Sequence, residues 1–248
     1  MLKHVDLCSG IGGFALGFHW AGLSDPILFC DTDPFCQKVL SKNFPGVRID
    51  DDVKELAHDP KRLVPDCDIL TAGYPCQPFS LSGKRKGEKD ERHIWPYIRT
   101  ILEEKRPSCC VFENVYGHIG MGLETVIRDL NDLNYSLQCF VIPSSYAGAP
   151  HRRDRVWIVA YSDSPFIKGR GIPSGVQQKH TNINGAVDKG RWQKRDHWES
   201  EPRVDRVAYG LPTWVDINRR NHALGNAIVP QIAYRIGLAI RAAYEVTF

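Results

Sequence analysis

One cysteine of this chain lies where its neighbours favour chemistry. Cys76 is the fourth residue of the segment 73–80 (Gly-Tyr-Pro-Cys-Gln-Pro-Phe-Ser), which follows an apolar run at 68–72 typical of a buried strand. Pro75 and Pro78 prevent an immediate helix, so Cys76 is expected on a stiff loop at the carboxyl end of that strand. Ligands and catalytic groups collect at this edge of open α/β sheets. The alternative is a small, inert cysteine buried beside a turn.

An acid and a group of arginines follow later apolar runs. Glu113 comes directly after the run 109–112, and burial there would raise its pKa and suit it to donate a proton. The segment 151–155 (His-Arg-Arg-Asp-Arg) separates apolar runs at 137–142 and 156–161. Its arginines favour contacts with anions or bases, although a salt-bridged surface turn has the same composition.

A glycine-rich turn near the N-terminus is typical of a nucleotide-type cofactor site. The segment 9–14 (Ser-Gly-Ile-Gly-Gly-Phe) separates a predicted strand at 4–8 from an apolar, periodic stretch that ends at Trp20. Glycines let the backbone approach a ligand, and the following helix offers free N–H groups. The turn lacks a clean Gly-x-Gly-x-x-Gly pattern and the lysine of a P-loop, so it is weak evidence alone.

Acids follow the next two predicted strands. Asp31 follows the apolar run 27–30 and could accept hydrogen bonds from ribose hydroxyls. Asp33 precedes Pro34 and is expected to cap a helix instead. One of the three acids at 50–52 could lie near the amine of an adenine, although adjacent acids are more often a solvated turn.

Strands and helices alternate along most of the chain, which predicts an α/β fold. Strands are expected at 4–8, 27–30, 47–49, 68–72, 109–112, 137–142 and 156–161, and helices at 14–20, 34–44, 93–105, 123–133 and 228–244.

The composition is that of an ordinary globular protein. Of 248 residues, 42% are hydrophobic and 25% charged, and no apolar run approaches the roughly 20 residues that span a bilayer. Asp6 stands where a signal peptide would have its apolar core, so a cytoplasmic location is expected. None of the eight cysteines forms a Cys-x-x-Cys pair, which argues against a structural zinc site and for reduced thiols.

Two polar segments differ from the rest of the chain. Residues 162–203 hold few aliphatic side chains, and from Lys168 to Arg195 seven Lys or Arg stand against one acid. Such a segment could contact phosphates or form a solvated face. Residues 82–92 are charged and contain glycine, which favours a lid beside the Cys76 loop.

Five blocks of the sequence, in family order, resemble the DNA cytosine-5 methyltransferases. Residues 6–14 are similar to the S-adenosylmethionine loop, 73–84 to the nucleophile loop and 113–115 to the acid motif. Residues 151–155 are similar to the Gln-x-Arg-x-Arg block, with histidine in place of glutamine, and 224–230 (Leu-Gly-Asn-Ala-Ile-Val-Pro) to the last motif. Each block is a modest signal, but five in order make chance similarity improbable.

The resemblance implies a fold and its division into parts. It implies a three-layer, Rossmann-like methyltransferase sheet, mostly parallel with an antiparallel strand pair at its end. Residues 1–161 and 224–248 would form the catalytic domain, and 162–223 a small, loop-rich lobe that recognises DNA. Compact phage, plasmid or restriction-modification enzymes are the most similar members. Cys8 and Thr32 depart from the family, which often has Phe and another large residue against the cofactor at these positions.

The resemblance also implies an activity. S-adenosylmethionine would supply a methyl group to C5 of a cytosine flipped out of double-stranded DNA, through a covalent bond between Cys76 and C6. S-adenosylhomocysteine would be the product, and no metal is expected. The protein is expected to act as a monomer, away from membranes, with a cognate restriction endonuclease as a candidate partner.

The resemblance assigns site residues by their place in the blocks. The implied catalytic residues are Cys76, Glu113, Asn114, Arg153 and Arg155. The implied cofactor residues are Asp6, Cys8, Ser9, Gly10, Ile11, Gly12, Gly13, Asp31, Thr32, Asp52, Val53, Gly73, Pro75, Trp95, Asn226 and Ala227. The implied DNA contacts are Gln77, Ser80, Ser82, Lys84, Arg92, Arg152, Arg170, Arg191 and Arg195.

Three other functions are weighed against this one. A tRNA cytosine-5 methyltransferase would share the same core. A binding module without catalysis has no need of Cys76, Glu113 and Arg155 together. A nicotinamide oxidoreductase is disfavoured by the glycine pattern and leaves Pro-Cys-Gln unexplained.

Overall fold

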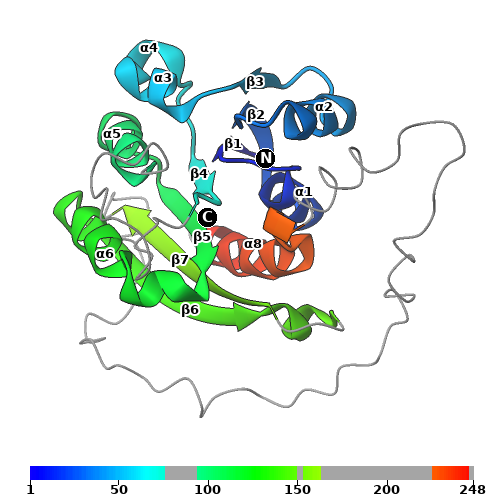
Figure 1. The fold of residues 1–248 in the computed structure, drawn as a ribbon, viewed down its shortest axis with the longest axis vertical. Coiled ribbons are helices and arrows are strands. Elements are labelled where there is room, and N and C mark those ends of the chain that lie inside the picture. Colours follow the sequence, from blue (N-terminus) through cyan, green and yellow to red (C-terminus); the bar gives the residue numbers. More distant parts are fainter. Residues whose placement is uncertain (76–93, 150–152, 163–224, 246–248) are drawn as a thin grey trace, which may run out of the picture.

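Seven strands form one mixed sheet in the order β3-β2-β1-β4-β5-β7-β6 (Figure 1). The computed structural model describes residues 1–75, 94–149, 153–162 and 225–245. The strands are β1 (Leu2–Leu7), β2 (Ser24–Cys30), β3 (Arg48–Asp50), β4 (Ile69–Ala72), β5 (Cys109–Val115), β6 (Tyr135–Pro143) and β7 (Asp154–Ser162). The first five run parallel, and β7 pairs antiparallel with both β5 and β6. This arrangement confirms the predicted α/β fold, a mostly parallel sheet with an antiparallel strand pair at its end.

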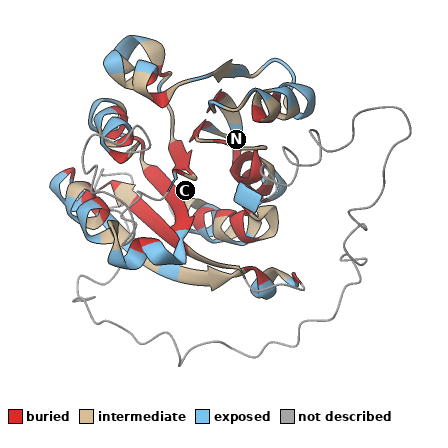
Figure 2. Ribbon diagram, in the orientation of Figure 1, coloured by how far each residue is buried: buried red, intermediate tan, exposed pale blue. Residues whose placement is uncertain are grey.

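Helices cover both faces of the sheet. They are α1 (Gly13–Trp20), α2 (Pro34–Asn43), α3 (Val53–His58), α4 (Pro60–Leu63), α5 (Trp95–Lys105), α6 (Leu123–Asp132) and α8 (Pro230–Glu245), with 3-10 turns η2 (Tyr116–Gly120) and η3 (Ser144–Ala147). The central strands are buried on both sides (Figure 2), which explains their nearly continuous apolar sequences.

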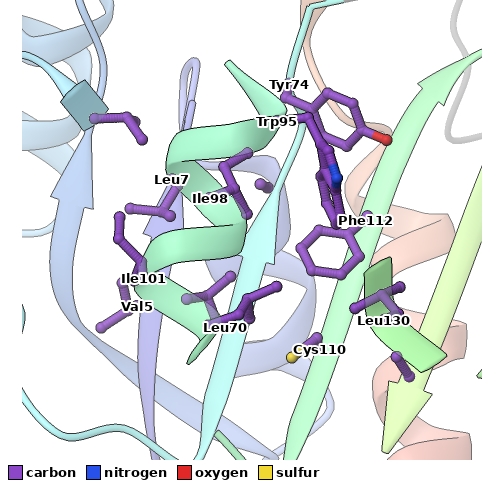
Figure 3. Close-up of a cluster of buried hydrophobic side chains, with 14 of the residues drawn as sticks. Val5, Leu7, Leu70, Tyr74, Trp95, Ile98, Ile101, Cys110, Phe112 and Leu130 are labelled. Atoms are coloured by element: carbon purple, nitrogen blue, oxygen red, sulfur yellow. The ribbon is translucent and has the colours of Figure 1, made fainter. Parts of the chain in front are cut away.

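Alternate residues of the central strands pack into two hydrophobic cores, one on each face of the sheet. Leu70 and Phe112 pack with Ile98 and Ile101 of α5 on one face, together with α3 and α6 (Figure 3). Their neighbour Ile69 points to the other face, where α1 and α8 pack. This alternation is the period of two expected for β-strands, here filled with apolar residues on both sides.

Caps define the short helices. Asp33 accepts a hydrogen bond from the Phe35 N–H at the start of α2, which confirms its predicted capping role. Asp52 and Asp59 cap α3 and α4 in the same way. These two helices were not predicted, because six and four residues are too few to show a helical apolar period.

Several strands are longer than predicted, and β2 and β5 extend furthest at one end. β2 begins at Ser24 rather than at 27 and therefore contains Pro26. Proline has no N–H to donate, but β3 pairs with β2 only from Leu28 onward, so no hydrogen bond to β3 is lost at Pro26. β5 continues through Val115, so Glu113 lies within the strand, opposite Trp157 of β7. The acid is therefore held by a sheet ladder rather than by a loop.

The last helix packs closely on the first. A Cβ atom added at Gly17 of α1 would lie 2.5 Å from the carbonyl oxygen of Pro230, and one at Gly13 would lie 2.5 Å from that of Ile228. Only glycine allows this approach. It places α8 and the segment before it directly beside the glycine-rich turn.

The two ends of the described chain lie at the same edge of the sheet. Tyr244 of α8 shares a hydrogen bond with the Ser108 hydroxyl (2.7 Å), and Ser108 bonds the Asp68 carbonyl oxygen (2.9 Å). The Asp68 carboxylate in turn accepts a hydrogen bond from the Lys3 N–H (2.7 Å). Among the described helices, none is long and apolar enough to cross a membrane.

Candidate active site

The strand register brings the candidate residues to one edge of the sheet. Leu7 of β1 lies opposite Cys30 of β2 and Ala72 of β4, and Ala72 lies opposite Phe112 of β5. The residues that directly follow these four strand positions therefore lie next to one another near the carboxyl ends of their strands. They are Cys8, Asp31, Gly73 and Glu113. Cys76 itself lies outside the described residues, which end at Pro75 in this segment.

The glycine-rich turn is held in a left-handed conformation by an acid from the next strand. Cys8, Gly10 and Gly12 have φ values of 50°, 55° and 86°. Asp31 accepts a hydrogen bond from the Gly10 N–H (2.7 Å) through one carboxylate oxygen and from the Asp33 N–H (2.9 Å) through the other. Asp31 thus shapes the turn, and its contact with a ribose stays a prediction.

Asp6 presents a carboxylate oxygen that no described residue satisfies. The side chain is fully buried at the end of β1, and its Oδ1 accepts a hydrogen bond from the Thr71 hydroxyl (2.6 Å). Its Oδ2 is buried without a hydrogen-bond partner among the described residues. Burial, and secondarily the nearby Asp31 carboxylate, raise the pKa of Asp6 well above its usual value. A cationic group of a ligand would satisfy this oxygen.

Glu113 and Arg155 form a buried ion pair. Arg155 Nε lies 2.9 Å from Glu113 Oε1, and the glutamate is 7% exposed. Burial raises the pKa of Glu113 to about 7, while the charges of Arg155 and Arg153 act in the opposite direction. The carboxyl group can therefore carry a proton near neutral pH, as predicted for a proton donor.

Arg153 and Asn114 both bind backbone. Arg153 donates to the Ala227 carbonyl oxygen (2.9 Å), which ties the start of β7 to the segment before α8. Asn114 is 2% exposed and donates to the Tyr74 carbonyl oxygen (3.1 Å), two residues before Cys76. Both contacts position neighbouring segments, and direct catalytic roles for the two side chains stay predictions.

The family model for C-5 cytosine-specific DNA methylases matches residues 2–202. The chain belongs to this family. Type II methyltransferase M2.BsuMI of Bacillus subtilis (strain 168) is 36% identical over 168 residues, which cover 64% of this chain and 42% of the relative. Type II methyltransferase M.HhaI of Haemophilus parahaemolyticus is 33% identical over 177 residues, covering 69% and 53%. The chain thus spans about half the length of these methylases.

A solved structure shares the fold. The Spodoptera frugiperda DNMT2 E260A/E261A/K263A mutant superposes with a TM-score of 0.57 at 26% identity, over 66% of this chain and 51% of that one. The methylase family and this fold imply the use of S-adenosylmethionine.

The residues of the turn fit that cofactor. S-adenosylmethionine carries a cationic sulfonium and ammonium, and a cation bound here would favour ionisation of Asp6 and Asp31, whose pKa values burial raises. A Cβ added at Gly10 would meet nothing within 4 Å, so the turn borders open space. Among the described residues, no cluster of three or more His, Cys, Asp or Glu could hold a metal ion.

Other residues predicted to bind the cofactor have structural contacts of their own. Trp95 is 2% exposed and donates to Asp129 Oδ2 (2.8 Å) beneath the candidate site. Asp52 caps α3, and Val53 lies in the core at 4% exposure. Thr32 is exposed. Contacts of these four residues with a cofactor stay predictions.

Several assigned residues lie outside the described part of the chain. These are the nucleophile Cys76 and the predicted DNA contacts Gln77, Ser80, Ser82, Lys84, Arg92, Arg152, Arg170, Arg191 and Arg195. The predicted lid at 82–92 and the basic segment 168–195 lie outside it as well.

Sequence reasoning gave no role to Thr71, Tyr74 and His118, which form hydrogen bonds at the candidate site. Thr71 bonds Asp6 through its hydroxyl, and the Tyr74 hydroxyl lies 3.0 Å from Nε2 of His118. A polar side chain within an otherwise apolar strand is the signal that could have identified Thr71. No local signal marks His118, because its partner lies 44 residues earlier.

Proposed function

We propose that this methylase transfers a methyl group from S-adenosylmethionine to C5 of a cytosine flipped out of double-stranded DNA. The observation that carries the proposal is the buried Glu113–Arg155 pair at the sheet edge where the chain leads into Cys76. When bound, S-adenosylmethionine supplies the methyl group on a positively charged sulfur.

Covalent catalysis compensates for the low nucleophilicity of cytosine C5. The Cys76 thiolate adds to C6 while Glu113 gives its proton to N3, and the ring becomes an enamine whose C5 can attack the methyl group. Removal of the C5 proton by a base, with return of the N3 proton to Glu113, then lets the Cys76 thiolate leave by elimination and restores the double bond between C5 and C6. Arg155 holds Glu113 in place and would bind the carbonyl oxygen of the same base.

Double-stranded DNA is the proposed substrate because the family model that matches this chain is that of C-5 cytosine-specific DNA methylases. C6 is shielded in a stacked duplex, so the cytosine must be flipped out. Unstacking and unpairing the base costs on the order of a few kcal/mol. Residues 162–223 would form the lobe that recognises DNA. Phosphate contacts from its basic segment would offset the free-energy cost of flipping the base. We expect the protein to act as a monomer in the cytoplasm, with a cognate restriction endonuclease as its candidate partner.

A covalent adduct tests the mechanism. Duplex DNA that carries 5-fluorocytosine blocks removal of the group at C5, so the enzyme should remain bound through Cys76 as a denaturant-resistant, gel-shifted species. The adduct should require S-adenosylmethionine and should be absent with Cys76→Ser, which keeps the size of the side chain. No adduct with the unsubstituted protein would overturn the proposed mechanism.

The choice of nucleic acid needs its own comparison. Methyl incorporation into duplex DNA and into tRNA should be measured side by side at equal cytosine concentration. Preferential methylation of tRNA would contradict the DNA assignment, even if the same cysteine forms the adduct.

A further inference from the structure

Tyr74 is held from two sides by the segment that carries Glu113. Asn114 donates to its carbonyl oxygen (3.1 Å), and its hydroxyl lies 3.0 Å from Nε2 of His118. All three residues are buried, with exposures of 3%, 2% and 1% for Tyr74, Asn114 and His118. The last described part of the chain before Cys76 is therefore attached once to β5, the strand of Glu113, and once to η2, the turn that follows it.

Aromatic packing leaves Tyr74 little freedom to move. Its ring lies 5.5 Å from that of Trp95 and 6.4 Å from that of Phe112, between centroids (Figure 3). The His118 ring meets it edge-on, at 82°. Contacts from α5, β5 and η2 therefore converge on this tyrosine, and Trp95 is itself held by a hydrogen bond to Asp129 of α6.

His118 has a single side-chain hydrogen bond in the described structure, and it is the one to Tyr74. Nδ1 is buried without a partner among the described residues, and a Cβ added at Gly122 would lie 3.1 Å from Cε1 of the ring. Burial of an imidazole with one unsatisfied nitrogen costs free energy, so its presence here calls for an explanation. A nonpolar ring would fill the same space without that penalty.

We propose that Tyr74 and His118 form a positioning pair that fixes the Cys76 loop relative to the Glu113 carboxyl group. The inference rests on the proposed function, since it concerns the same cysteine and the same acid. Cys76 lies two residues after Tyr74, and Glu113 lies next to Asn114. The hydrogen bonds of Tyr74 to His118 and Asn114 therefore join the two segments that contain the reacting groups. A displacement of about 1 Å in such a site can reduce the rate by about 100-fold.

Removal of the hydroxyl tests the pair. Tyr74→Phe keeps the aromatic packing and should slow formation of the 5-fluorocytosine adduct by about 5- to 10-fold in single turnover, the loss expected for one hydrogen bond. Dissociation constants for S-adenosylmethionine and DNA should stay within about 2-fold, because neither ligand is bound by the hydroxyl.

A second set of variants separates positioning from folding. Tyr74→Phe/His118→Phe should react no more slowly than His118→Phe alone, because both changes remove the same bond. His118→Gln, which keeps a polar group near the position of Nε2, should recover much of the rate. Independent, multiplicative losses in the double variant, or no recovery with glutamine, would contradict the pair.

Tyr135→Phe is the matched control. Tyr135 is also a buried tyrosine, 2% exposed, and its hydroxyl donates to the Pro107 carbonyl oxygen (2.8 Å), away from the candidate site. It should lose comparable stability without slowing the adduct. If Tyr74→Phe and Tyr135→Phe alter melting and rate alike, the role of Tyr74 is structural only. If the unsubstituted protein forms no adduct, the proposed function fails and not the pair alone.

Discussion

Glu113 holds its proton in the neutral range because its carboxyl group is buried. The unfolded chain releases this proton near pH 4.5 and the folded protein near pH 7, so the folded state binds more protons between these values. The free energy of unfolding should therefore contain a contribution that falls by about 3 kcal/mol as the pH rises from 4.5 to above 7.

Glu113→Gln removes this contribution. The difference in unfolding free energy between Glu113→Gln and the unsubstituted protein should shift in favour of the variant as the pH rises through 7. Urea unfolding at a series of pH values measures it, with Glu104→Gln as the control for the loss of an exposed carboxyl group. A difference that does not change with pH would show that Glu113 is already ionised in the folded protein.

For single residues, the sequence predicted which side chains have chemical roles better than it predicted their hydrogen-bond partners. Glu113 could be predicted because an acid at the end of an apolar run must be buried or neutralised. The partners of Asp31 and Arg153 could not, since Asp31 binds a backbone N–H 21 residues earlier and Arg153 a carbonyl oxygen 74 residues later. Such bonds depend on the register of strands and on where the last helix packs.

Among the elements, α1 and α8 show how closely the fold depends on glycine. Gly17→Ala should destabilise the protein by about 1 to 3 kcal/mol, because the new Cβ would lie 2.5 Å from the Pro230 carbonyl oxygen. Helix propensity alone predicts the opposite sign, about 1 kcal/mol in favour of alanine. The urea midpoint of unfolding, at an unchanged slope, is the measurement.

Gly120→Ala provides the matched control for this substitution. It lies in η2, and a Cβ there would meet nothing within 4 Å. Its unfolding midpoint should stay close to that of the unsubstituted protein. Equal destabilisation by both substitutions would argue against close packing of α1 on α8.

The element order was predictable because the strands are apolar and are mostly separated by helices of eight or more residues or by turn residues. The exceptions have local causes. α3 and α4 begin at Asp caps rather than on an apolar period, and β2 extends across Asp25 and Pro26, which usually end a strand.

For the whole molecule, the inserted residues 162–223 carry the proposed contacts with DNA. The triple substitution Arg170→Ala/Arg191→Ala/Arg195→Ala should weaken duplex binding and reduce the slope of log affinity against log salt by up to about three, one for each phosphate contact. S-adenosylmethionine affinity should be unchanged. Lys38→Ala/Lys42→Ala/Lys61→Ala removes the same charge from exposed positions elsewhere, and an equal loss in that variant would contradict a specific basic footprint.

The hydrogen bonds that join Tyr244, Ser108, Asp68 and Lys3 have a topological consequence. They place the end of α8 and the start of β1 together at the edge of the sheet away from the glycine turn and Glu113. A short linker could join these two ends, and new termini could be opened in the segment between β7 and α8. The site is therefore compatible with a circularly permuted order of the same elements, in which the last helix would come first in the sequence.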